Sequence, residues 1–233
     1  QCHYVLNMLY KFGMTDCRPF STPLDRNQKL CPDSGPACNE KRFRQIVRSL
    51  IYLTITRPDI SYSVGMVSQF MQKPTLEHLQ CVQRIMRYVS GTKDRGLLYR
   101  SDITEELVGY TDADWAGDAS DRRSTSGFMF SLGSAAVAWS SKKQPTVALS
   151  STEAEYRGAT VATCEAIWLR RLLQDLRIKV PTPILIYYDN MSSMQLAKNP
   201  VFHARTKHIE VHYHFVRERV LSGEVELRYV QTD

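Results

Sequence analysis

Three carboxylates, Asp112, Glu155 and Asp189, are the residues of this sequence whose types and spacing could do metal chemistry. Asp112 follows an apolar run in VGYTDADWAGD, and Asp189 follows ILIYY, so we expect each at the carboxyl end of a strand. Ligands of α/β sheets gather at the carboxyl ends of parallel strands. Converging carboxylates repel one another unless cations neutralise them, and their hard oxygens favour Mg²⁺ or Mn²⁺. Two such ions can activate water and stabilise an in-line phosphodiester displacement.

Each acid alone also has a purely structural interpretation. Asp112 could cap a turn, Glu155 could stabilise the start of its helix, and Asp189 could begin an Asp-Asn turn. Asp114 and Asp118 are expected to be turn and surface acids. The metal interpretation therefore depends on whether the fold brings the first three together.

The elements that must position these acids follow from the hydrophobic pattern after residue 96. Strands are predicted at 96–100 and 106–112, followed by a hairpin over 124–141 that turns at Gly133-Ser134. A long amphipathic helix over 150–176 comes next, with Ser150, Ser151 and Thr152 available to cap it. A buried strand at 183–190, a helix at 206–223 and a strand at 225–232 complete the pattern. The sequence predicts an α/β fold, a mixed sheet with helices packed on it.

The first part of the chain has a different pattern. Residues 18–39 contain four prolines and read as an extended connection. Apolar residues at helical spacing then predict helices within 39–56, 59–72 and 76–92, with Asn39 as a cap and Gly91 as a stop. Residues 1–95 are therefore predicted to form a smaller, mostly helical segment.

The net charge of +6 is unevenly distributed. Residues 1–100 hold 15 Lys and Arg against 7 Asp and Glu, whereas residues 101–233 hold 15 against 17. The first part could face a polyanion, although basic charge also serves solubility. Six basic residues are candidates for phosphate binding, although each could equally be a solvated surface charge. They are Arg84, Arg87, Arg122, Arg123, Lys142 and Lys143.

Other site classes have little support in the sequence. The six cysteines form no CxxC pair, which favours free thiols over a zinc ribbon. No apolar run approaches the roughly 20 residues that span a bilayer, so no membrane partner is expected. Trp115 and Trp139 are expected to pack rather than to stack on bases. The first residue is Gln1, which suggests a piece of a longer polypeptide.

Several long motifs resemble one known family. YTDADWAGD, AWSSKKQPTVALSSTEAEY, IYYDN and TKHIEVHYHFVRE are similar to the ribonuclease H domain of copia-type LTR retrotransposon Pol polyproteins. TPLD, RQIVRSLIYLTITRPDISYSV and RIMRYVSGT resemble the segment between the reverse transcriptase palm and that domain. The resemblance implies a connection or thumb-like segment over 1–95. Over 96–233 it implies a ribonuclease H-like mixed five-stranded sheet with flanking helices.

The same resemblance implies an activity and a site. Family members cleave the RNA strand of RNA–DNA hybrids endonucleolytically, with two magnesium ions held by an Asp, Glu, Asp, Asp set. The first three match Asp112, Glu155 and Asp189. The implied partners are the RNA–DNA hybrid and the rest of the Pol polyprotein, including the palm. The implied location is intracellular, in a cytoplasmic virus-like particle or the nucleus.

The chain also departs from the family pattern. The fourth family aspartate follows the last strand, and this chain ends at Asp233 before reaching it, so the domain is expected to be truncated. Glu210, the only evident substitute, precedes that strand. The YxDD motif of the polymerase is absent. Arg48 replaces a family glycine and is expected to disturb packing. Two alternatives therefore stay open: a non-catalytic hybrid-binding remnant, and a decayed transposon fragment.

Overall fold

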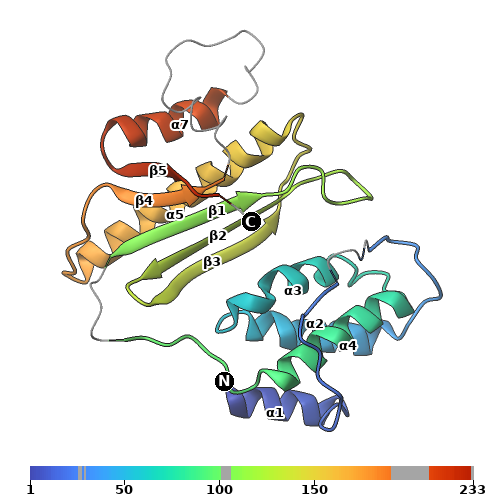
Figure 1. The fold of residues 1–233 in the computed structure, drawn as a ribbon. Coiled ribbons are helices and arrows are strands. Elements are labelled where there is room, and N and C mark those ends of the chain that lie inside the picture. Colours follow the sequence, from blue (N-terminus) through green and yellow to red (C-terminus); the bar gives the residue numbers. More distant parts are fainter. Residues whose placement is uncertain (26–27, 29, 101–105, 190–209, 232–233) are drawn as a thin grey trace. The chain divides into compact units, whose positions relative to one another are not determined.

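The computed structural model describes residues 1–25, 28, 30–100, 106–189 and 210–231, without the side chains of 210 and 211. It divides the chain into two compact units, the N-terminal unit (Gln1–Leu97) and the C-terminal unit (Leu98–Asp233) (Figure 1). Each unit has its own hydrophobic core. We describe each unit by itself.

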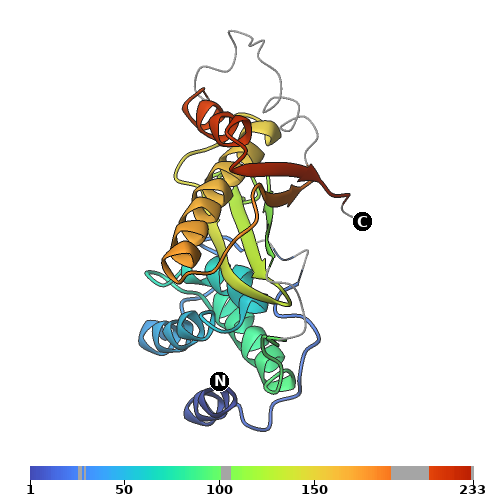
Figure 2. The same cartoon turned by 90° about the vertical axis from the view of Figure 1, so that its left-hand side faces the viewer.

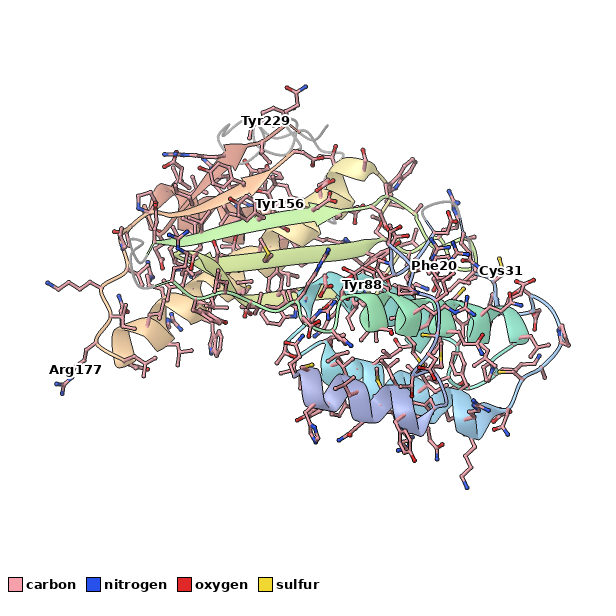
Figure 3. The ribbon with its side chains drawn as sticks, turned by 60° about the horizontal axis from the view of Figure 1, so that its bottom comes forward. Phe20, Cys31, Tyr88, Tyr156, Arg177 and Tyr229 are labelled. Carbon is pink, nitrogen blue, oxygen red and sulfur yellow. The ribbon has the colours of Figure 1, made fainter. Side chains whose placement is uncertain are left out.

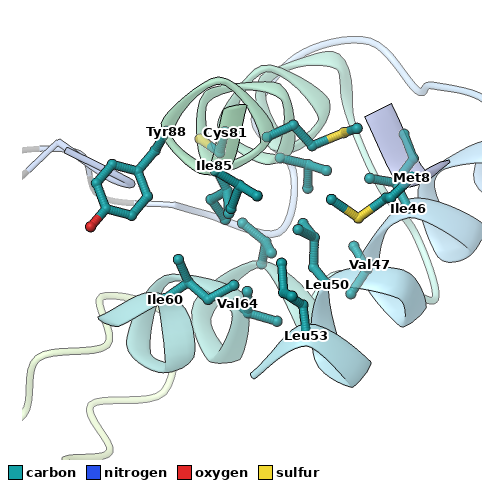
Figure 4. Close-up of a cluster of buried hydrophobic side chains, with 14 of the residues drawn as sticks. Met8, Ile46, Val47, Leu50, Leu53, Ile60, Val64, Cys81, Ile85 and Tyr88 are labelled. Carbon is teal, nitrogen blue, oxygen red and sulfur yellow. The ribbon is translucent and has the colours of Figure 1, made fainter. Parts of the chain in front are cut away.

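The N-terminal unit is helical. It consists of α1 (Cys2–Lys11), α2 (Glu40–Leu53), a short 3-10 turn η1 (Pro58–Ile60), α3 (Ser61–Ser68) and α4 (Leu76–Gly91). The Asn39 side chain caps α2 by accepting a hydrogen bond from the Arg42 backbone N–H at 2.9 Å, as expected. Apolar side chains from all four helices meet in one core, which Figure 4 shows in close-up. The sequence pattern did not predict α1.

An ion pair between Arg57, whose side chain is buried, and Asp59, whose side chain is partly exposed, belongs to the N-terminal unit. The Arg57 guanidinium donates to both carboxylate oxygens of Asp59, at 2.8 and 2.7 Å, and to the Thr92 carbonyl at 2.9 Å. The Tyr88 hydroxyl, labelled in Figure 4, donates to Asp59 at 2.8 Å. These bonds connect the turn after α2 to the end of α4. The hydrogen bonds that Arg57 donates offset the desolvation cost of burying its charge.

The C-terminal unit is a five-stranded mixed sheet with helices packed on it. Its strands are β1 (Leu107–Ala113), β2 (Thr125–Leu132), β3 (Ala135–Lys143), β4 (Ile184–Tyr188) and β5 (Val225–Tyr229), in the spatial order β3-β2-β1-β4-β5. The β1–β2 and β2–β3 pairs are antiparallel, and the β1–β4 and β4–β5 pairs are parallel. The predicted α/β fold is confirmed.

Two helices cover one face of this sheet. The helix α5 (Ser151–Asp175) packs on β1 and β2, and α7 (Glu210–Leu221) packs beside α5 (Figure 2). Leu107, Gly109, Thr111 and Ala113 of β1 are buried, and the residues between them are less so. This alternation is the pattern of a strand with one covered face. Figure 3 labels Tyr156, an α5 residue buried in this core.

Two expectations about local structure are wrong. Residues 96–100 do not form a strand. They contact the β2–β3 hairpin through side-chain hydroxyls; for example, the Tyr99 hydroxyl donates to the Ala136 carbonyl at 3.1 Å. Arg48 does not disturb packing, because it lies on the exposed side of α2. Its presence therefore gives no structural sign of decay.

Candidate metal and nucleic-acid site

The two aspartates come from neighbouring parallel strands at the centre of the sheet (Figure 1). Tyr110 of β1 pairs with Tyr187 of β4, and Asp112 and Asp189 each lie two residues further along. Because side chains alternate along a strand, the two acids project from the same face at the same end of the sheet. Asp112 is the penultimate residue of β1, and Asp189 follows β4 directly.

Glu155 comes from α5, one turn after its first residue. Ser150 caps this helix as predicted, because its side chain accepts a hydrogen bond from the Glu153 backbone N–H at 3.1 Å. Further along α5, Gly158 allows a close approach to β1. A Cβ there would lie 3.4 Å from the Ala113 Cβ. The helix therefore crosses β1 beside Asp112.

The structure brings the three predicted acids together. One carboxylate oxygen from each of Asp112, Glu155 and Asp189 lies within 4.8 Å of the others. The acids differ in exposure, since Asp112 is exposed, Asp189 is half-buried and Glu155 is only 9% exposed. This separation suits ligands that surround a cation, because three charged groups this close need a counter-ion.

Burial and mutual repulsion perturb the acid cluster. Burial, followed by the charges of Asp112 and Asp189, raises the pKa of Glu155 to about 8. Partial burial and the nearby Asp189 also raise the pKa of Asp112. A bound cation would favour the charged form of these carboxylates and so oppose the rise in their pKa. A set of hard oxygen donors with unrelieved repulsion fits Mg²⁺ or Mn²⁺ and has no soft ligand suited to zinc.

A second glutamate, Glu153, lies in the same turn of α5 but is engaged elsewhere. Its carboxylate is 1% exposed, accepts a hydrogen bond from the Leu149 backbone N–H at 2.8 Å, and pairs with Arg157 at 2.6 Å. Arg157 also donates to the Thr146 carbonyl at 3.0 Å. Sequence reasoning did not identify this pair, although its i, i+4 spacing was a visible signal. The pair fixes the β3–α5 loop (residues 144–150) against the start of the helix.

The β1–β2 loop (residues 114–124) is held by its own acids. Asp114 accepts a hydrogen bond from the Thr125 backbone N–H at 2.7 Å, which fits the turn role expected for it. Asp118 is not a free surface acid, because it is buried and binds the Lys143 ammonium at 2.6 Å. Burial alone would raise the pKa of Asp118, but Lys143 and Ser120 lower it to about 2.

The basic candidates near this loop differ in availability. Lys143 binds both Asp118 and Asp121, and Arg123 lies 3.6 Å from Asp121. Arg122 and Lys142 are exposed, and neither forms a salt bridge within the described part of the chain. Arg122 and Lys142 therefore remain the more available of the four for phosphate contact.

Arg84 and Arg87 both lie against the extended segment before α2. Their guanidinium carbons are 4.7 and 5.6 Å from the centre of the Phe20 ring, which Figure 3 labels. Arg84 also donates to the Thr22 hydroxyl at 2.9 Å. These contacts give both arginines a structural role within the N-terminal unit. The two do not lie in the unit that contains the acid cluster.

Glu210, considered as a substitute for the fourth acidic ligand, has its side chain outside the described residues. No helix in the described ranges is long and apolar enough to cross a membrane.

Comparison with known proteins gives close sequence relatives. No family model matches the chain. The retrovirus-related Pol polyprotein from transposon RE1 of Arabidopsis thaliana is 45% identical over 233 residues, which are 100% of this chain and 16% of that protein. The corresponding polyprotein from transposon TNT 1-94 of Nicotiana tabacum is 40% identical over 238 residues, covering 99% of this chain and 18% of that protein.

Among solved structures, LC11-RNase H1 in complex with an RNA/DNA hybrid matches with a TM-score of 0.38 and 12% identity. The match covers 53% of this chain and 83% of that one. The strand order β3-β2-β1-β4-β5, and not this likeness, defines the fold of the C-terminal unit. Because the Pol relatives match along the whole chain, the chain is a homologue of a segment of the retrovirus-related Pol polyproteins of transposons, and it spans less than a fifth of their length.

Proposed function

We propose that the C-terminal unit hydrolyses the RNA strand of RNA–DNA hybrids endonucleolytically, with divalent metal ions, during reverse transcription. The observation that carries this proposal is the approach of the Asp112, Glu155 and Asp189 carboxylates to within 4.8 Å, with Glu155 buried. Such a cluster is unstable as three free charges and stable as a ligand set. Homology to Pol polyproteins supports a nucleic-acid substrate.

Each acid has a distinct task in this proposal. Asp112 and Asp189 would hold the cations from two adjacent strands, and Glu155 would complete the ligand set from the first turns of α5. Two bound Mg²⁺ or Mn²⁺ ions would supply an activated water and charge stabilisation for an in-line displacement. The rigid sheet keeps the two aspartates in register, and the capped start of α5 fixes the position of Glu155.

The rest of the chain places this activity in a larger protein. We propose that residues 1–95 are the connection segment that follows the reverse transcriptase palm. The working partners are then the hybrid and the remaining Pol polyprotein. The expected location is a cytoplasmic virus-like particle or the nucleus.

A cleavage assay tests the proposal. The chain is incubated with magnesium and an RNA–DNA hybrid that carries a different fluorophore on each strand, beside a DNA duplex of the same sequence. We expect the RNA strand of the hybrid to be cut, and the DNA strands to remain intact. Asp112→Asn should reduce the rate by about 10³-fold or more, because the remaining ligands cannot hold the same charge.

Other outcomes would contradict the proposal. Binding of the hybrid without cleavage would favour the non-catalytic remnant. A version of the chain extended past Asp233 to supply a fourth carboxylate distinguishes the two cases, since it should cleave if only that carboxylate is needed. Cleavage that survives Asp112→Asn would show that the acid cluster is not the active site.

A further inference from the structure

Trp115 is the third residue after Asp112 and is 54% exposed. The expectation that this side chain packs is met only in part, because about half of the Trp115 surface is exposed. An exposed tryptophan is unusual because it leaves a large apolar surface in water. Only two residues separate Trp115 from Asp112, so the exposure of its ring needs an explanation.

The Trp115 ring is held in place although it is exposed. Its indole Nε1–H donates to the Ala148 carbonyl of the β3–α5 loop at 3.1 Å. On the next residue, the Ala116 backbone N–H donates to the Ser124 hydroxyl at 3.1 Å. The preceding residue, Asp114, is bonded to Thr125 at 2.7 Å. With both neighbours anchored and its only polar atom satisfied, the ring presents an apolar surface in a fixed orientation.

Ala148, which accepts the hydrogen bond from Trp115, packs against sequence neighbours of the acid cluster. Ala113, Ala148 and Ala154 pack together as a small buried cluster. Ala113 is adjacent in sequence to Asp112, Ala154 is adjacent to Glu155, and Ala148 accepts the indole hydrogen bond. The packing that fixes the positions of Asp112 and Glu155 therefore also fixes the position of the Trp115 ring. Leu149, the residue after Ala148, is 72% exposed.

We propose that Trp115 is a substrate-binding residue whose indole face packs against a sugar or an unstacked base of the hybrid, next to the phosphate at the acid cluster. This inference rests on the proposed function. The wide, shallow minor groove of an A-form-like duplex exposes its sugars to such a flat surface. Since the indole N–H is occupied, the contact is apolar and independent of base sequence. The exposed Arg122 of the same loop supplies charge for a nearby phosphate.

A matched pair of variants tests this inference. Trp168 on α5 is also 54% exposed, but it lies thirteen residues after Glu155, or about 20 Å along the helix. Hybrid binding is measured by fluorescence anisotropy in the full chain with Asp112→Asn, which prevents cleavage in every variant. Trp115→Ala should weaken binding about tenfold, and Trp168→Ala less than about twofold. Trp115→Phe should keep most of the affinity, because a flat aromatic face remains.

The outcomes separate this inference from the proposed function. If the parent chain cleaves the hybrid but Trp115→Ala binds as tightly as Trp168→Ala, only the role of Trp115 is overturned, and its exposed face then fits a protein contact. If Trp115→Phe loses as much affinity as Trp115→Ala, the hydrogen bond to Ala148 matters and not the aromatic face, which also overturns it. If the parent chain neither binds nor cleaves the hybrid, both proposals fail. Circular dichroism checks that each variant is folded.

Discussion

At the scale of single residues, Glu155 is the acid of the cluster whose charged form is most disfavoured by burial and by neighbouring charges. It is buried beside two aspartates, and its pKa is raised to about 8. The sequence predicted all three acids, because its pattern puts two of them at strand ends and the third near the start of a long helix. The sequence pattern alone could not separate Glu155 from Glu153, since both lie near the start of the same helix. Only the structure shows that Glu153 is paired with Arg157.

Neutralising one acid should stabilise the metal-free chain. At pH 8, Glu155→Gln removes a buried charge that is repelled by Asp112 and Asp189. We expect the free energy of unfolding in EDTA to rise by about 1–3 kcal/mol, as measured by urea denaturation. A lower stability than that of the parent chain would mean that the Glu155 carboxylate makes favourable contacts that outweigh the repulsion.

The same repulsion predicts how stability depends on pH. The pKa of Glu155 is about 8 in the folded chain and near its ordinary value of 4.5 in the unfolded chain. Between these values the folded state binds more protons, so stability falls as pH rises, by up to about 1.4 kcal/mol per pH unit. Magnesium, which competes with the proton, should raise the melting temperature more at pH 8 than at pH 6. An equal rise at both pH values would place the bound metal elsewhere.

At the scale of elements, the site depends on close packing around β1. Gly109 faces the covered side of this strand, and a Cβ there would lie 2.4 Å from the buried Phe130 ring. The alternating pattern predicted the strand itself and the hairpin beside it. It could not predict which glycine meets an aromatic ring, because that depends on the pairing of Gly109 with Phe130.

A substitution at Gly109 should therefore destabilise the sheet. Gly109→Ala is expected to cost about 1–3 kcal/mol, because Phe130 must move within a packed core. Gly127→Ala on β2 is the matched control, since its Cβ would meet only the Ser140 carbonyl at 3.6 Å. Chemical denaturation of both variants measures the difference. Equal stabilities would show that the Phe130 ring has room to adjust.

At the scale of the whole molecule, the chain consists of two units with separate cores. The sequence predicted this division from the change in hydrophobic period, together with three of the four helices of the N-terminal unit. It missed α1, which comes before the proline-rich segment. It also suggested phosphate-binding roles for Arg84 and Arg87, whose contacts with Phe20 depend on distant parts of the chain meeting.

Separate cores predict separate responses to perturbation. Arg57→Ala removes a buried side chain and leaves the Thr92 carbonyl without its partner, so it should destabilise the N-terminal unit by about 1–3 kcal/mol. Magnesium should stabilise only the C-terminal unit. Differential scanning calorimetry should show one transition that moves with Arg57→Ala and another that moves with magnesium. A single transition that responds to both would mean that the two units unfold together.

The most direct test of the acid cluster compares the two glutamates of one helix turn. Cleavage of an RNA–DNA hybrid is measured over a range of magnesium concentrations for the parent chain, Glu155→Gln and Glu153→Gln. Glu155→Gln should abolish cleavage at every concentration, because it removes a metal ligand. Glu153→Gln should keep substantial activity, because its carboxylate binds Arg157 and the Leu149 backbone and not the cluster. Activity that survives Glu155→Gln would contradict the proposed site.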